Sequence, residues 1–250
     1  MSKKHLAGLV AVIFGASLLC GCYSPAPQQD SQISTTVEPT PAAPDYEAQI
    51  KLLAERSEEW NQDDGVLPYY YHQYTVTDLD WNGRLEILAM SIQGTGIFTY
   101  GKIFEGNEDG TSLLECSLPF AYGALPEMIC DFVPAAFDPA DGTYYYLFRD
   151  DLKNGYAEHY QSIQALHLKN GAIYSNSLGR MSIVATDGVV KEEYFKSDQL
   201  MTSEEYEAII PSFQVELEGF TATQGWFTLE DSIDEAALAK SWEYFRSSRN

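Results

Sequence analysis

Five β-prone runs and three Asx-Gly pairs occupy residues 143–195, which read TYYYLFRDDLKNGYAEHYQSIQALHLKNGAIYSNSLGRMSIVATDGVVKEEYF. The pairs tolerate the positive φ angles that tight hairpin turns require. The runs between them are rich in Tyr, Phe, Val and Ile, which favour strands. This alternation predicts antiparallel strands joined in sequence order, a meander. The runs are Thr143–Phe148, Tyr156–Leu168, Ile173–Ser177, Ile183–Ala185 and Val189–Phe195.

The same pattern extends upstream. Further Asx-Gly pairs are Asp64-Gly65, Asn82-Gly83, Asp109-Gly110 and Asp141-Gly142, and the runs between them are Tyr69–Thr77, Leu85–Ile92, Ile97–Phe104 and Phe132–Phe137. The pairs follow no fixed period, which favours one curved sheet capped by helices over a propeller-like repeat. Residues 85–90 are apolar at nearly every position, so this strand is expected to be covered on both faces.

Three segments have helical patterns. The first is 46–61, with Asp45 as its N-cap; the others begin at the capping-box patterns Thr202–Glu205 and Ser232–Glu235. The second helix is expected to end before Pro211, because proline removes a backbone hydrogen bond. The predicted fold class is α+β, mainly an antiparallel meander with N- and C-terminal helices.

The composition limits the function classes. The chain has 37 acidic against 15 basic residues, a formal charge of −22, and is 45% hydrophobic. That hydrophobic share predicts a folded domain. The charge argues against nucleic-acid binding and against docking on anionic lipid through a basic face.

The N-terminus has the pattern of a targeting segment. Lys3 and Lys4 precede an uncharged, mostly apolar stretch, Leu6–Leu19, which is short for a membrane span. The segment ends Leu19-Cys20-Gly21-Cys22, which resembles the bacterial lipobox, although Cys20 is an unusual residue at its position.

The lipobox resemblance implies a lipoprotein with a signal peptide at 1–21. Acyl chains such as palmitate on Cys22 would anchor it to the cell membrane, on the extracytoplasmic face. The alternative is an ordinary secretory signal with a coincidental cysteine. Residues 22–45 are rich in Pro, Gln, Ser and Thr and are expected to form a disordered tether, followed by a single β-rich domain at 46–250. Cys116 and Cys130 then remain as a disulfide or as two free thiols.

One nine-residue segment carries candidate metal ligands: Asp78-Leu79-Asp80-Trp81-Asn82-Gly83-Arg84-Leu85-Glu86. Oxygen-bearing side chains stand at positions 1, 3, 5 and 9, and glycine at position 6 permits a sharp reversal. Calcium prefers six to eight oxygen ligands. An EF-hand would need Glu at position 12, where Ala89 stands.

With β-prone flanks, the segment instead resembles the calcium-binding hairpins of integrin-α and VCBS/FG-GAP-type repeats. The resemblance implies calcium bound by Asp78, Asp80, Asn82, the carbonyl of Arg84, and Glu86. The alternative is a hairpin turn with Asp and Asn caps and no ion.

The expected function is a non-catalytic binding or scaffolding domain at the cell envelope, with an envelope protein or a glycan as partner. Serine-hydrolase and HExxH motifs are absent from the sequence. The alternative function is an envelope hydrolase that uses paired carboxylates.

Overall fold

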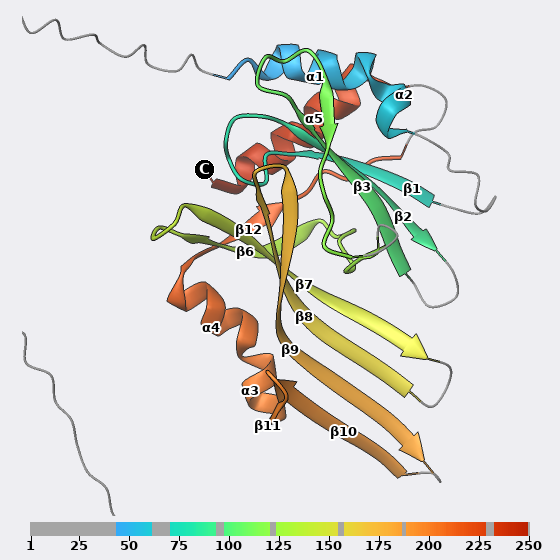
Figure 1. The fold of residues 1–250 in the computed structure, drawn as a ribbon, viewed down its shortest axis with the longest axis vertical. Helices are drawn as coiled ribbons and strands as arrows, with labels where there is room; N and C mark the ends of the chain where they lie inside the picture. Colours follow the sequence, from blue (N-terminus) through green and yellow to red (C-terminus); the bar gives the residue numbers. More distant parts are fainter. Residues whose placement is uncertain are drawn as a thin grey trace, which may run out of the picture. The chain divides into compact units, whose positions relative to one another are not determined.

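Two antiparallel sheets carry the fold, and in each most strands pair in sequence order (Figure 1). The computed structural model describes residues 44–61, 71–93, 98–120, 124–154, 158–186, 189–228 and 233–249. The predicted signal peptide and Cys22 lie outside the described residues, as does the tether up to residue 43. The elements below belong to one compact unit, Ala42–Asn250. The α+β class with a mainly antiparallel meander is confirmed.

The small sheet comprises β1 to β5, in the order β1-β2-β3-β4, with β5 paired to β3. Its strands are β1 (Tyr71–Thr77), β2 (Glu86–Gln93), β3 (Phe98–Gly106), β4 (Leu113–Glu115) and β5 (Ala124–Leu125). Strands β1 and β2 form a hairpin that pairs Thr77 with Glu86. The predicted calcium loop therefore connects these two strands.

The large sheet comprises β6 to β12, in the order β11-β10-β9-β8-β7-β6-β12. Its strands are β6 (Phe132–Asp138), β7 (Thr143–Asn154), β8 (Glu158–Lys169), β9 (Ala172–Thr186), β10 (Val189–Lys196), β11 (Gln199–Met201) and β12 (Glu218–Thr223). The predicted Asn170-Gly171 turn joins β8 to β9, and both residues have positive φ angles, 52° and 69°. Strand β9 merges two predicted runs into one.

The helices are α1 (Tyr46–Glu55), α2 (Ser57–Trp60), α3 (Ser203–Glu207), α4 (Ile209–Glu216) and α5 (Glu235–Arg246), followed by a short 3-10 helix, Ser247–Arg249. Asp45 caps α1 as predicted, accepting a hydrogen bond from Ala48 N at 3.0 Å. The predicted capping box of Thr202 and Glu205 is also present. Helix α5 is capped by Asp234, two residues after the predicted start at Ser232.

The helix that the Thr202–Glu205 capping box opens ends before Pro211, as predicted, and a separate helix follows it. Helix α3 ends at Glu207, and α4 begins at Ile209 with Pro211 in its first turn. The first backbone N–H groups of a helix have no partner within the helix, so proline costs little there.

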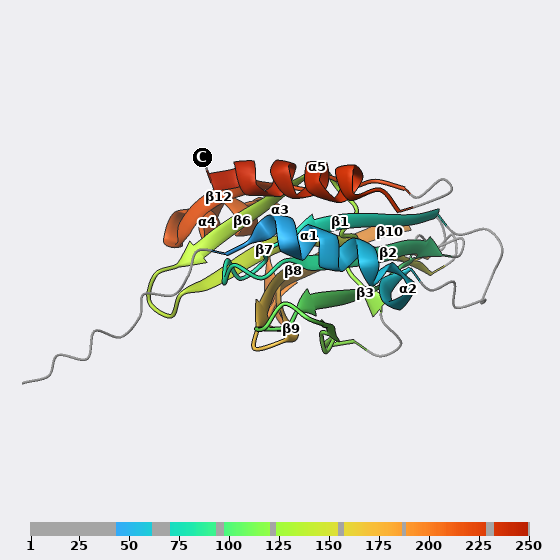
Figure 2. The same cartoon turned by 90° about the horizontal axis from the view of Figure 1, so that it is seen from above.

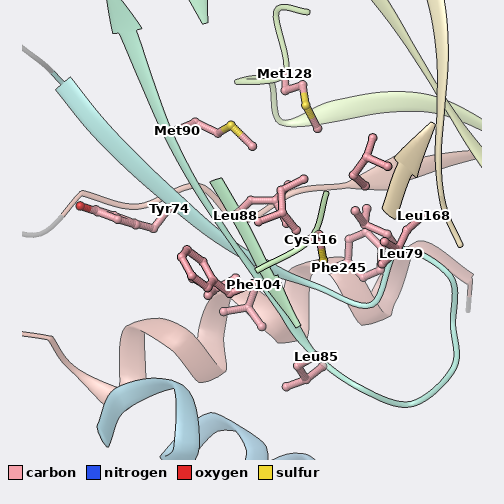
Figure 3. Packing of buried hydrophobic residues seen from close by; sticks show 14 of the residues in the cluster. Tyr74, Leu79, Leu85, Leu88, Met90, Phe104, Cys116, Met128, Leu168 and Phe245 are labelled. Carbon is pink, nitrogen blue, oxygen red and sulfur yellow. The ribbon is translucent and has the colours of Figure 1, made fainter. Parts of the chain in front are cut away.

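The prediction of one curved sheet was wrong, because the strands divide into two sheets. One buried cluster joins residues of both sheets with α1 and α5, so a single core fills the space between these elements (Figure 3). Helices α1 and α5 contact each other and cover the small sheet (Figure 2). Strand β2 is buried on both faces, as its apolar sequence predicted.

Candidate metal centre

The loop between β1 and β2 is held in place by helix α1. Gly83 has a φ angle of +86°, and a Cβ atom there would lie 2.5 Å from Pro44 Cγ, so only glycine fits. The Gln49 amide donates to Gly83 O at 2.9 Å and accepts from Leu85 N at 2.7 Å. The loop is therefore tied to the first turn of the domain's first helix.

Three of the predicted ligands converge in this loop. Asp78, Asp80 and Glu86 each place a carboxylate oxygen within 4.8 Å of the others, and we call these three residues the acidic cluster. Oxygens that bind one calcium at about 2.3–2.6 Å each lie no more than about 5 Å apart. The spacing of the acidic cluster thus fits a single calcium ion.

Two members of the acidic cluster, Asp78 and Glu86, are buried, and Asp80 is partly buried. Asp78 is 1% exposed and Glu86 is fully buried. Asp78 Oδ2 accepts from Gly83 N at 3.0 Å, and Glu86 Oε2 accepts from Thr77 Oγ1 at 2.9 Å and from Leu79 N at 2.7 Å. In contrast, Asp78 Oδ1 and Glu86 Oε1 have no hydrogen-bond partner among the described residues. Leaving such an oxygen buried and unpaired costs about 1–3 kcal/mol, and more for a charged group.

Burial and mutual repulsion act on the protonation of these carboxyls. Burial raises the pKa of Asp78 to about 7, and the charges of Asp80 and Glu105 add to this, while the hydrogen bond from Gly83 opposes it. Burial, followed by the charges of Asp78 and Asp80, raises the pKa of Glu86 well above its usual range. Burial and the Glu105 charge also raise the pKa of Asp80. A bound cation would remove this penalty, because it favours the ionised carboxylates.

The structure adds a further buried acid, Glu105, for which the sequence gives no local signal. It lies on β3 directly opposite Glu86 and is 2% exposed. Its Oε1 accepts from Arg84 Nη2 at 2.7 Å and from Asn82 Nδ2 at 2.8 Å. Because Glu105 lies 19 positions beyond Glu86 in the chain, only the β2–β3 register reveals that the two acids meet.

The other two predicted ligands make different contacts. Asn82 Oδ1 accepts from Arg84 N at 2.7 Å, and Asn82 Nδ2 donates to Asp80 Oδ2 at 3.0 Å, so its amide nitrogen faces the acids. The Arg84 side chain pairs with Glu105. Ligation through Asn82 Oδ1 and the Arg84 carbonyl stays a prediction.

Trp81 provides an optical reporter inside the loop. Its φ angle is +54°, and its indole stacks on Phe245 of α5 with ring centroids 5.4 Å apart. It also contacts Tyr144 of β7. A change in the loop therefore changes the surroundings of a tryptophan.

The donor set is one of hard oxygens. Cys116 lies in the same core, where burial raises the pKa of its thiol to about 12, and the nearby carboxylates add to the shift. Cys116 and Cys130 are both free thiols, so of the two alternatives the disulfide is not formed. Carboxylates without a thiolate favour calcium over a softer transition metal.

No helix in the described part of the chain has the length and apolar character needed to span a membrane. Comparison with known proteins gives no match: no family model, no curated protein and no solved structure is significantly similar to this chain. Its function must therefore be inferred from its own residues.

Proposed function

We propose that this protein is a lipid-anchored, extracytoplasmic lipoprotein whose folded part is a non-catalytic binding domain with one structural calcium ion. The observation that carries the calcium proposal is the pair of buried, unpartnered oxygens in the acidic cluster, Asp78 Oδ1 and Glu86 Oε1. An ion between them would satisfy both oxygens and offset the repulsion among three acids.

The anchor and the location rest on the N-terminal sequence. The pattern Leu19-Cys20-Gly21-Cys22 supports cleavage before Cys22 and attachment of lipid to it. Residues 22–45 would then hold the folded unit away from the membrane surface. Lipid at Cys22 suffices for this attachment when more than one acyl chain is present.

The burial of the acids supports a structural role over hydrolysis. A pair of catalytic carboxylates must flank the bond that it cleaves. Asp78 and Glu86 are instead closed off from solvent and bonded to the backbone of their own hairpin. This geometry stabilises the hairpin and offers no access to a substrate. Binding of an envelope protein or a glycan would then take place elsewhere on the surface.

Calcium-dependent melting tests the proposal on the chain from residue 22 with Cys22→Ser. At a thousandfold excess of calcium over its Kd, binding to the native state adds about 4 kcal/mol, or about 8–16 °C in Tm. Trp81 fluorescence should change over the same calcium range. Asp78→Ala should abolish both responses.

Asp109→Ala is the matched control, because Asp109 is exposed in another Asx-Gly turn, where it accepts from Thr111 N at 3.2 Å. This variant should respond to calcium like the parent chain. Equal melting temperatures in calcium and in EDTA would refute the metal site. For the anchor, Cys22→Ser should release the full-length protein from the membrane fraction and Cys20→Ser should not.

A further inference from the structure

A cavity with a volume of about 450 Å³ lies between α5, the start of β6 and the segment at the end of β12. This is within the range of small-molecule sites, about 300–1,000 Å³. One wall is the face of α5 that carries Lys240, Ser241 and Tyr244. The opposite wall is the start of β6, at Asp131 and Phe132, and the segment Thr223–Phe227 that follows β12.

The walls of this cavity are held rigidly. Trp226 Nε1 donates to Cys130 O and to Gln224 Oε1, both at 3.0 Å, so the indole has a fixed position. A Cβ atom on Gly225 would lie 2.8 Å from Ser241 Cα, which shows how closely this segment packs on α5. Ser241 Oγ in turn accepts from Val76 N of β1 at 2.9 Å. The cavity is therefore formed before any ligand arrives, which lowers the entropic cost of binding.

Three side chains of the lining carry polar atoms that have no hydrogen-bond or ion-pair partner among the described residues. Gln224 is 2% exposed, and with its Oε1 bonded to Trp226, its Nε2 has no partner among the described residues. Asp131 and Lys240 form no ion pair with any described residue. The cavity thus presents the Asp131 carboxylate as an acceptor and the Lys240 ammonium as a donor, while Gln224 Nε2 is a buried, unpartnered donor within its wall.

Aromatic rings complete the lining. Phe132 is 67% exposed and Tyr244 is 46% exposed, and Trp226 is half-buried. Within the described part of the chain, none of these three rings packs on another aromatic ring. Phe132 and Tyr244 therefore offer exposed ring surface to an apolar surface of a ligand, while Trp226 packs against the core and forms part of the wall.

We infer that this cavity binds a neutral sugar unit of a glycan, an inference that rests on the proposed binding function and assigns it a site. The C–H face of a pyranose stacks on aromatic rings, and its hydroxyls both donate and accept. They would donate to the Asp131 carboxylate and accept from the Lys240 ammonium. A free amino acid would pair with both charges but would leave most of the aromatic surface uncovered.

The test uses the chain from residue 22 with Cys22→Ser, in calcium. The probes are glucose, galactose, mannose, N-acetylglucosamine and short oligosaccharides of each, and saturation-transfer NMR detects binding. At least one probe should bind, and Tyr244→Ala and Asp131→Asn should each weaken it tenfold or more. Both variants should melt like the parent chain, because both residues lie at the surface.

Tyr174→Ala is the control, since Tyr174 is 49% exposed on β9 and does not line the cavity. It should bind the probe with unchanged affinity. The inference is overturned if no sugar binds, if glycine or alanine binds while sugars do not, or if Tyr244→Ala and Asp131→Asn bind as tightly as the parent chain.

The two proposals fail in different ways. Loss of sugar binding with intact calcium-dependent melting would reject the cavity and leave the calcium domain. Cleavage of an oligosaccharide in the NMR sample would contradict the non-catalytic function while supporting the cavity as a sugar site.

Discussion

The small sheet and the half of the large sheet that contains β10 are both built from antiparallel hairpins, but they differ in what covers them. In β2, Ile87, Leu88 and Met90 are fully buried, because the helices and the rest of the core cover both faces of the strand. In β10, Val189 and Val190 are 68% and 61% exposed. The burial of these strands is therefore decided by the layer that packs on them and not by the strand sequence alone.

The same difference governs the acids. In the small sheet, Asp78 and Glu86 are closed off from water and their pKa values rise. In the large sheet, Asp151 remains partly exposed and accepts from Gln161 Nε2 at 2.8 Å. The buried acids of the small sheet therefore need a counter-ion or protons, whereas solvent and neighbouring side chains stabilise the partly exposed Asp151 of the large sheet.

The largest expected effect is the response of the calcium-free protein to pH. Asp78 binds its proton more tightly when folded, with a pKa of about 7 against 3.8 for the ordinary carboxyl. Between these values the native state holds more protons than the unfolded state, so stability falls as pH rises from about 4 to 7 and is level above. The loss is at most about 4 kcal/mol.

Urea denaturation in EDTA at several pH values measures this loss. The difference between the parent chain and Asp78→Asn isolates the Asp78 carboxyl from other titrating groups. Excess calcium should flatten the curve of the parent chain. Stability that rises from pH 5 to pH 7, relative to Asp78→Asn, would show that Asp78 is not in this environment.

Truncation of matched apolar residues should give the next largest effect. Leu88→Ala removes a fully buried side chain from β2 and should lower the free energy of unfolding by about 3 kcal/mol. Val190→Ala in β10 should change it by less than about 0.5 kcal/mol. If chemical denaturation gave the same loss of unfolding free energy for both variants, the part of the large sheet that contains β10 would be covered in solution.

A smaller effect than that of Leu88→Ala is expected for the helix that covers part of the large sheet. Thr202 Oγ1 accepts from Glu205 N at 3.2 Å and Glu205 Oε2 accepts from Thr202 N at 2.8 Å, which fixes α3 and its buried Tyr206. Thr202→Ala should cost about 1 kcal/mol. Amide exchange should quicken in α3 and β10 and stay unchanged in β1–β3, and faster exchange in both sheets would contradict this local effect.

The parts of the fold that could be predicted were those determined by neighbours in the chain. Asn170-Gly171 forms its turn, Thr202 and Glu205 form their capping box, and Gly83 supplies the reversal in the loop. Asp78, Asp80 and Glu86 converge as the spacing indicated, because one hairpin carries all three. The ion itself stays a prediction.

The parts that could not be predicted depend on distant pairing. The division into two sheets and the position of β12 beside β6 are set by the packing of the whole unit. Glu105 joins the acids only through the β2–β3 register, and the cavity lined by Asp131 and Lys240 forms only when α5 docks. No local sequence signal marks these contacts.

The docking of helix α5 determines when the small sheet can be completed during folding. It is the last long element to be synthesised, yet it closes the first sheet: Ser241 meets Val76, 165 residues earlier in the chain. Strands β7 to β10 pair with immediate neighbours and need no such partner. We expect the hairpins of the large sheet to form first during folding, and the small sheet to wait for the final helix. A chain truncated before residue 235 would keep its local hairpins and lose the layer that shelters the acidic cluster.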